Sequence, residues 1–570
     1  MKRLAETGHR LLSDPRTRVA LTVACLVMGT ALPFLLVPFE VFRFRDEPYQ
    51  AYCCLEYSRA YPALLTFFAG NKWMEAFGQT FIALRYLMTV CFVSSAAVGY
   101  AYMRIRKVSA LRASVVYMII AIGLVLTYLP IYNWDSGAYP STALGLLVLL
   151  LYIDSPSRAK AALMGAAVGP MILFRLPMVA ALAVMTVFVM AAPEASYPKR
   201  QRLADVGTLT TCAAAIFMIG ICVISGSPRA YISSFSLGNT VGGHRLADIP
   251  EIIRFSYELA VAQYKFMLPS LVAILLSVCF TKCRRHGWIL WTGALLLTYY
   301  SVKTVIYNHG DWTFFWSHNG LLTPLAFVAI FFTPLYANLK GEATDRKTIW
   351  GVLALVAFML LQGFGSDAVS ERIGWVLAMA FAFGVNKSAM DRCGRFVRYM
   401  LIFSSASLLC YFAFVIRRLE CSWDEPLRTR YTPAINGTRN YHPFDYHLDI
   451  DSVKFVFDNL RDRGITTAVV GKDCCSYTFI LEETTPNSTM RYIPPIDEVI
   501  ADIELASGRG AVIGWMDCEK DSTIGGALAE AGYGKWLQIG DDFSLYATDS
   551  VAGRLPGNPF REWGYEGPGE

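Results

Sequence analysis

The chain has 570 residues, of which 55% are hydrophobic and only 17% are charged, and its mean hydropathy is +0.40. A soluble protein of this length could not bury so much apolar surface, so the composition excludes an ordinary soluble globular protein. The net charge of +6 is modest, and the basic residues are scattered between apolar blocks. This distribution argues against a nucleic-acid partner and indicates that the basic residues set a membrane topology.

Apolar blocks recur from near the N-terminus to about residue 416. They predict about thirteen transmembrane helices, at 19–40, 79–103, 113–131, 141–153, 161–175, 177–192, 207–225, 266–281, 288–306, 320–337, 348–363, 372–386 and 397–416. Several are shorter than the roughly 20 residues of an upright span, which implies local thinning of the bilayer or shielding by protein. The first block is long and has no evident cleavage site before Phe42, so we interpret it as a retained anchor rather than a signal peptide.

Lysine and arginine predict which side each loop occupies, because cytoplasmic loops carry the excess of basic residues. With a cytoplasmic N-terminus and thirteen alternating helices, the basic clusters all fall inside: residues 2–18, 104–107, 199–202, 282–285, 346–347 and 392–398. The loops at 132–140, 307–319 and 363–371 have no lysine or arginine and fall outside. The segment 41–78 and the C-terminal tail also fall outside.

The composition changes near Glu420, where the apolar blocks end. We therefore expect two domains, a transmembrane domain at 1–418 with an outer loop at 41–78, and a soluble extracytoplasmic domain at 419–570. Helix patterns at 451–463, 496–506 and 523–531 alternate with strand patterns at 466–471, 510–515 and 543–548. This alternation is typical of a small α/β domain.

Adjacent acids, Asp46 and Glu47, follow the first predicted span. After them, acidic and basic residues among aromatics continue to about residue 78, a pattern typical of short helices lying on the bilayer surface. An acid at the rim of a membrane helix is a functional hypothesis. The simpler alternative is that both acids only mark a helix end that faces water.

The other outer loops add polar candidates. Asp135 lies in the loop Tyr132–Pro140, and His309, Asp311 and His318 lie beside four aromatics in the loop 308–319. Aromatic rings beside polar groups suit sugar faces as well as the membrane interface. The His/Asp spacing matches no standard metal motif and the 14 cysteines form none, so a divalent metal and any disulfide pairing stay open.

Four cations lie within or at the edge of apolar blocks: Arg85, Arg175, Lys303 and Arg372. In the predicted topology each falls in the outer half of its helix. Arginine offers forked donors that match phosphate, and lysine a point charge, so an anionic lipid headgroup would satisfy them. Alternatively, they pair with acids such as Glu371 or extend to the interface.

Acids and phosphate-binding cations on the same membrane face suggest a sugar-transfer reaction. A carboxylate can deprotonate an acceptor hydroxyl, whose oxygen then attacks the anomeric carbon of a sugar with inversion. A lipid phosphate leaves readily when arginine holds its charge.

The residues Asp46-Glu47-Pro48-Tyr49-Gln50, Tyr61-Pro62 and Gly70-Asn-Lys-Trp73 lie where the GT-C superfamily of membrane glycosyltransferases has an acid-aromatic motif followed by Pro and Gly. The whole layout resembles that superfamily, and within it the branch of protein O-mannosyltransferases and the aminoarabinose transferase of lipid A. The resemblance implies a polyprenyl-phosphate sugar donor and a lipid, glycan or protein acceptor. It also implies Asp46 as general base with Glu47 the next candidate, Asp135 as an assisting or acceptor-binding acid, and a donor-cavity loop containing Asp367. It favours a bacterial inner (plasma) membrane.

Two other classes remain open. A transporter or flippase for lipid-linked or polar solutes would show two related halves with broken helices, and no such repeat is evident. A non-catalytic assembly or receptor protein would need neither the acids nor the cations. Acids and cations that converge at one outer cavity would favour the enzyme, whereas charges at mid-depth along a path through the membrane would favour transport.

Overall fold

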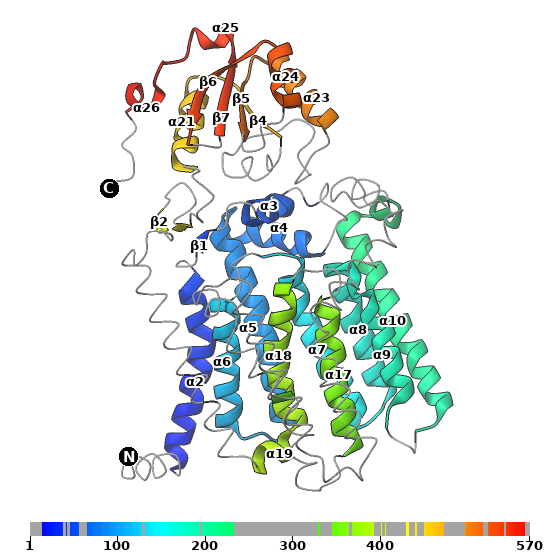
Figure 1. Cartoon of the computed structure of the whole chain (residues 1–570). Coiled ribbons are helices and arrows are strands. Elements are labelled where there is room, and N and C mark those ends of the chain that lie inside the picture. Colours follow the sequence, from blue (N-terminus) through cyan, green and yellow to red (C-terminus); the bar gives the residue numbers. More distant parts are fainter. Residues whose placement is uncertain are drawn as a thin grey trace, which may run out of the picture.

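Figure 1 shows the computed structural model, in which a long helical bundle is joined at one end by a small unit of helices and strands. The structure describes residues 14–37, 41–42, 46–55, 57, 65–127, 132–193, 197–232, 326, 329–330, 345–363, 368–392, 401, 405, 429–431, 439–441, 450–471, 496–516, 522–540 and 543–564. The predicted spans at 266–281 and 288–306 lie outside these residues, and those at 320–337 and 397–416 lie almost wholly outside them. The total of thirteen helices is therefore still a prediction.

The described helices of the bundle follow the predicted order. They are α2 (Pro15–Leu36), α3 (Asp46–Leu55), α4 (Leu65–Phe77), α5 (Phe81–Ile105), α6 (Ala110–Thr127), α7 (Trp134–Asp154), α8 (Arg158–Phe174), the 3-10 helix η2 (Leu176–Met178), α9 (Val179–Ala191), α10 (Lys199–Ser225), α17 (Arg346–Gly363), α18 (Ala368–Val385) and α19 (Lys387–Arg392). Four helices of the described part are long and apolar enough to cross a membrane: α2, α5, α10 and the part of α7 from Gly137. The chain is a multi-pass helical membrane protein with a small C-terminal sheet unit.

Two helix starts differ from the predictions. The loop expected at Tyr132–Pro140 is mostly helix, because α7 begins at Trp134 and the Asn133 side chain accepts a hydrogen bond from the Asp135 amide at 3.0 Å. Such a cap satisfies an amide that a helix start leaves unpaired. Similarly, α10 begins at Lys199 rather than at 207, directly after a proline and with residues that favour helix.

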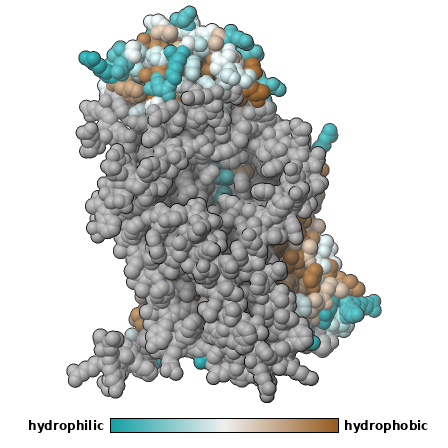
Figure 2. Space-filling model, in the orientation of Figure 1, coloured by the Kyte–Doolittle hydropathy of each residue, from teal (hydrophilic) through white to brown (hydrophobic). Residues whose placement is uncertain are grey.

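Two helices present broad apolar faces to the outside of the bundle. On α2, Val19, Val23 and Val27 are more than half exposed. Figure 2 shows a hydrophobic region on the side of the bundle, and on α10 Ile219 and Val223 are each 61% exposed. Exposed apolar area of this extent is unfavourable in water and favourable against lipid chains.

Charged side chains gather at one end of the bundle. Arg106, which follows α5, forms an ion pair with Asp154 at the end of α7, and Lys347 of α17 donates to the Asp154 carbonyl at 2.6 Å. Arg112, which lies six residues after Arg106, forms an ion pair with Asp391 of α19 at 2.7 Å. This grouping of basic residues from separate loops agrees with the predicted cytoplasmic side, although the orientation itself stays a prediction.

The C-terminal unit contains α21 (Ile450–Asp462), β4 (Thr467–Val470), α23 (Ile496–Gly508), β5 (Val512–Met516), α24 (Ser522–Glu530), β6 (Tyr533–Ile539), β7 (Phe543–Thr548) and the short helices α25 (Asp549–Ala552) and α26 (Pro559–Glu562). Its sheet has the order β4-β5-β7-β6, with β4 and β5 parallel and the other two pairs antiparallel. The six predicted elements are present, and β6 is additional.

A second, smaller sheet joins distant parts of the chain. Its strands are β1 (Val41–Phe42), β2 (Thr429–Tyr431) and β3 (Arg439–Tyr441). Strand β1 pairs in parallel with β3, with Val41 opposite Arg439, and β2 pairs with β3 in the antiparallel sense. The segment after the first span is thereby tied to the segment before the C-terminal unit.

Candidate active site at the α3–α4 end of the bundle

Helices α3 and α4 lie across the end of the bundle opposite the basic cluster (Figure 1). They pack closely because residue 70 is glycine: a Cβ there would lie 2.4 Å from Sγ of Cys54. Cys53 and Cys54 are buried thiols, and within the described residues neither forms a disulfide. The Trp73 indole donates to the Ala83 carbonyl at 2.8 Å, which fixes α4 to the first turn of α5.

Two buried charges at this end form an ion pair between α7 and the end of α8. Nε of Arg175 lies 3.0 Å from Oδ1 of Asp135, and the two side chains are 3% and 5% exposed. These two atoms make a charge contact rather than an aligned hydrogen bond. Burying both charges is costly, and their mutual attraction offsets the cost only when both are present.

Local backbone structure explains how these two residues meet. Asp135 lies in the first turn of α7. Arg175 has extended backbone angles, φ −153° and ψ 109°, and lies between the end of α8 and the start of η2. The side chain of Arg175 therefore leaves the α8 axis where α7 begins.

Hydrogen bonds from α4 and from the start of α7 join these elements. The Thr66 hydroxyl donates to the Phe174 carbonyl, and the Tyr132 hydroxyl donates to the Thr66 carbonyl, each at 3.1 Å. Gly137 allows the Phe174 ring to pack against α7, since a Cβ there would lie 2.8 Å from the ring. We expect this bonding to hold Arg175 in place beneath α4.

Arg85 lies one turn into α5 and is fully buried. Helices α5 and α7 run in the same direction, since their last residues meet at the Arg106–Asp154 pair. Nineteen residues separate Asp135 from Asp154 on α7, which corresponds to about 29 Å of helix. This is close to the ~30 Å hydrocarbon thickness of a bilayer, so Asp135 lies at the opposite boundary from the basic end. Arg85, at the corresponding position on α5, lies near the same level.

Most other predicted site residues are described only in part or lie outside the described residues. Asp46 and Glu47 occupy the first turn of α3, just after β1, and the positive end of a helix dipole favours acidic residues there. Arg372 lies in the first half of α18. Lys303, His309, Asp311, His318 and Asp367 lie outside the described part of the chain.

Two polar residues at this end were not predicted as site residues. Gln50 on α3 and Asn71 on α4 are more than nine-tenths buried, and in the described structure Oε1 of Gln50 and Oδ1 of Asn71 have no hydrogen-bond partner. A buried acceptor without a donor is unfavourable. Their positions in the sequence could have indicated burial, because Gln50 lies one helical turn before Cys54 and Asn71 directly follows Gly70.

A divalent metal is not indicated by the described residues. Among them, no group of three or more His, Cys, Asp or Glu side chains could hold a metal ion. Since three predicted polar residues of the 308–319 loop lie outside the described part, the metal question stays as open as it was from the sequence.

Comparison with known proteins gives similarity in structure alone. No protein-family model matches the chain, and no curated protein matches it in sequence. A crystal structure of ArnT from Cupriavidus metallidurans in the apo state aligns with 12% identity over 94% of this chain and 98% of that chain, with a TM-score of 0.39. The same protein bound to undecaprenyl phosphate aligns with 11% identity over 94% and 99%, with a TM-score of 0.41.

This similarity in fold is consistent with the GT-C resemblance of the sequence. At this identity and TM-score the similarity carries no argument about residues or substrates.

Proposed function

We propose that the protein is a GT-C-like membrane glycosyltransferase that moves a sugar from a polyprenyl-phosphate donor to an acceptor hydroxyl at the outer face of a plasma membrane. The observation that carries the proposal is the buried Arg175–Asp135 pair at the boundary of the bilayer. It lies at the end of the bundle where α3 begins with two acidic residues.

The distribution of buried charge favours transfer over transport. In the described residues of the bundle, the fully buried charged side chains are Arg85, Asp135, Arg175 and Asp205. The first three lie at the α3–α4 end, and Asp205 contacts Tyr152 near the basic end at 2.8 Å. None of these four lies at mid-depth, where a transported solute would need partners.

The reaction assigns a task to each group. Asp46, or Glu47 in its place, takes the proton from the acceptor hydroxyl. The acceptor oxygen forms a bond to the anomeric carbon from the face opposite the leaving group, the bond from that carbon to the phosphate oxygen breaks, and the configuration inverts. The lipid phosphate leaves with the electron pair. Arg175 and Arg85 stabilise its charge, and arginine suits this task because it has five N–H donors in a planar fork.

Asp135 orients Arg175 in this scheme. Held on a buried carboxylate, the guanidinium is positioned at the bilayer boundary before the phosphate arrives, so little reorganisation is needed in the transition state. The polar loop residues His309, Asp311, His318 and Asp367, with Lys303 and Arg372, remain proposed substrate-binding residues.

The proposal is tested by transfer from a labelled polyprenyl-phosphate sugar pool in membranes that contain either the native protein or Asp46→Asn. Removing a general base should lower the transfer rate by about 10²- to 10⁴-fold. Glu75→Gln is the matched control, because Glu75 is a half-exposed acid on α4 that pairs with Lys72. Unchanged transfer by an inserted Asp46→Asn protein would remove Asp46 from the mechanism.

A further inference from the structure

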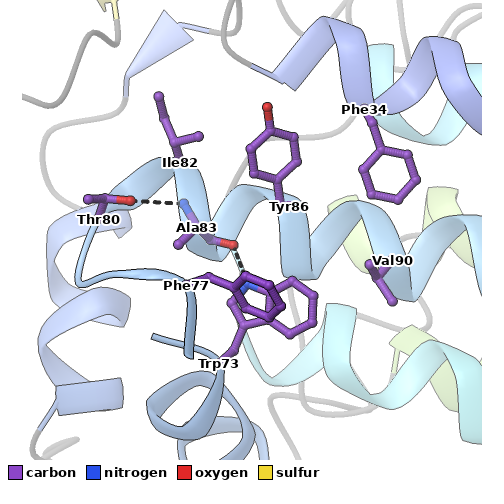
Figure 3. A pocket seen from close by; sticks show the side chains of 8 residues that line it. All are labelled: Phe34, Trp73, Phe77, Thr80, Ile82, Ala83, Tyr86 and Val90. Carbon is purple, nitrogen blue, oxygen red and sulfur yellow. Dashed lines mark hydrogen bonds between the residues drawn. The ribbon is translucent and has the colours of Figure 1, made fainter. Parts of the chain in front are cut away.

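An apolar groove opens on the side of the bundle where α2, α4 and the start of α5 meet. It is lined by Phe34, Trp73, Phe77, Thr80, Ile82, Ala83, Tyr86 and Val90 and encloses about 390 Å³. Figure 3 shows these side chains around the hollow. The volume lies within the roughly 300–1,000 Å³ range of ligand pockets. We name it the α2–α5 groove.

Two aromatic pairs form its walls. Trp73 and Phe77 are packed with their ring centres 4.3 Å apart, and Phe34 stacks on Tyr86 with centres 6.2 Å apart and an angle of 22° between the planes. Two hydrogen bonds on Ala83 fix the base: its carbonyl accepts from the Trp73 indole, and its amide donates to the Thr80 hydroxyl (Figure 3). The groove is therefore preformed, which lowers the entropy cost of binding.

The groove lies at membrane depth. Both α2 and α5 are candidate spans, and the lining positions Ile82, Tyr86 and Val90 follow one another at one-turn spacing along one face of α5. They cover about 12 Å of the helix axis. The groove thus runs from the interface, where α5 begins, into the hydrocarbon region.

Charge near the entrance is balanced. Lys72 precedes Trp73 on α4 and forms an ion pair with Glu75 at 2.8 Å, with both side chains about half exposed. The lining residues themselves carry no charge, and the neighbouring Lys72–Glu75 pair adds no net positive charge that would select an anionic headgroup. Recognition falls to the apolar walls.

We propose that the α2–α5 groove binds one acyl chain of a phospholipid from the surrounding leaflet, with the headgroup at the Thr80 rim. The surrounding bilayer supplies this ligand at high local concentration, and each chain methylene moved against the aromatic walls gains packing contacts. The inference needs no transferase activity and stands or falls separately from it. The bound lipid would have a structural role, filling the space between α2, α4 and α5.

The test uses a phosphatidylcholine with a photoactivatable diazirine in one acyl chain, in nanodiscs that contain the full-length protein. After illumination, labelled positions are mapped by mass spectrometry. Labelling should concentrate on the α5 stretch that contains Ile82 and Val90 and on the end of α2 at Phe34. Phosphatidylglycerol with the same chain should label to the same extent.

Ile82→Trp fills the groove and should lower labelling of the α5 stretch by about tenfold, which corresponds to about 1.4 kcal/mol of binding free energy. Ile219→Trp on the exposed face of α10 is the matched control and should label as the native protein does. If Ile82→Trp does not insert, Val90→Trp provides the same test deeper in the groove.

Three results would overturn the proposal. They are even labelling over the lipid-facing sides of α2 and α10, unchanged labelling of the groove in both tryptophan variants, and displacement of the phospholipid probe by a polyprenyl-phosphate at equal concentration. The third result would assign the groove to an isoprenoid chain instead.

Discussion

Replacing Asp135 with asparagine removes the carboxylate charge that lies 3.0 Å from Nε of Arg175 while keeping the size of the side chain. At that separation two unit charges attract by about 5.5 kcal/mol for an effective dielectric constant near 20. Desolvation of both groups opposes most of this attraction, yet breaking a buried pair from one side typically costs about 3–5 kcal/mol. We therefore expect Asp135→Asn to lower the free energy of unfolding by about 3–5 kcal/mol.

The double variant Asp135→Leu/Arg175→Met distinguishes charge from packing. Replacing both members of a buried pair with apolar residues is often neutral, so the double variant should recover most of the stability lost in Asp135→Asn. Thermal unfolding in detergent can be followed with a thiol-reactive dye, because Cys53, Cys54 and Cys91 are buried in the folded protein.

Two outcomes would refute this reasoning. In the first, Asp135→Asn has the same unfolding temperature as the native protein. In the second, the double variant is less stable than Asp135→Asn alone, in which case the pair contributes through shape rather than charge. A stable double variant also serves the functional question, since it should insert normally yet transfer no sugar if Arg175 holds the leaving phosphate.

Two further predictions concern packing and pH. Gly70→Ala places a methyl group 2.4 Å from Sγ of Cys54 and should destabilise the protein by about 1–3 kcal/mol. Gly207→Ala has open space around its Cβ and should stabilise α10 by about 0.5–1 kcal/mol. The same thiol assay compares the two variants, and a Gly70→Ala protein as stable as the native one would contradict the close α3–α4 contact. Hydrogen bonds from the Thr17 hydroxyl and amide hold the pKa of Asp14 below its ordinary value of 3.8, so the stabilisation of the first turn of α2 is complete above that value and is lost as the pH falls through and below it. The Thr17 amide should therefore exchange hydrogen faster in Asp14→Ala than in the native protein at pH 7 and at equal rates near pH 2, and equal rates at pH 7 would exclude the cap.

Local sequence signals predicted the helices well, but not all of their ends. The apolar block after Pro140 was visible, whereas the true start of α7 depends on the Asn133 cap and on a proline tolerated inside the helix. Strand β6, which the sequence did not predict, has a register irregularity between Lys535 and Leu537, and such an irregularity interrupts the period-two alternation by which a strand is recognised in a sequence.

The candidate site was predictable as a set of residues and not as a set of contacts. Arg175 stood out because a charge in or beside an apolar block is costly, and Asp135 stood out as an acid in a predicted outer loop. That they pair with one another depends on the packing of α7 against α8 and on the extended backbone at Arg175, which no local pattern encodes. Gln50 and Asn71 lie in the segments that carry the GT-C resemblance, but they were not predicted as site residues because uncharged amides are common at helix surfaces.

The pairing of β1 with β3 has a consequence for biosynthesis. Val41 emerges from the ribosome about four hundred residues before its partner Arg439, so the strand beside the two acids of α3 cannot be completed until nearly the whole bundle has been inserted. A truncated or stalled chain would thus carry the acids without the backbone partner that anchors them. If the acids act as proposed, an unfinished chain would stay inactive until β3 is in place.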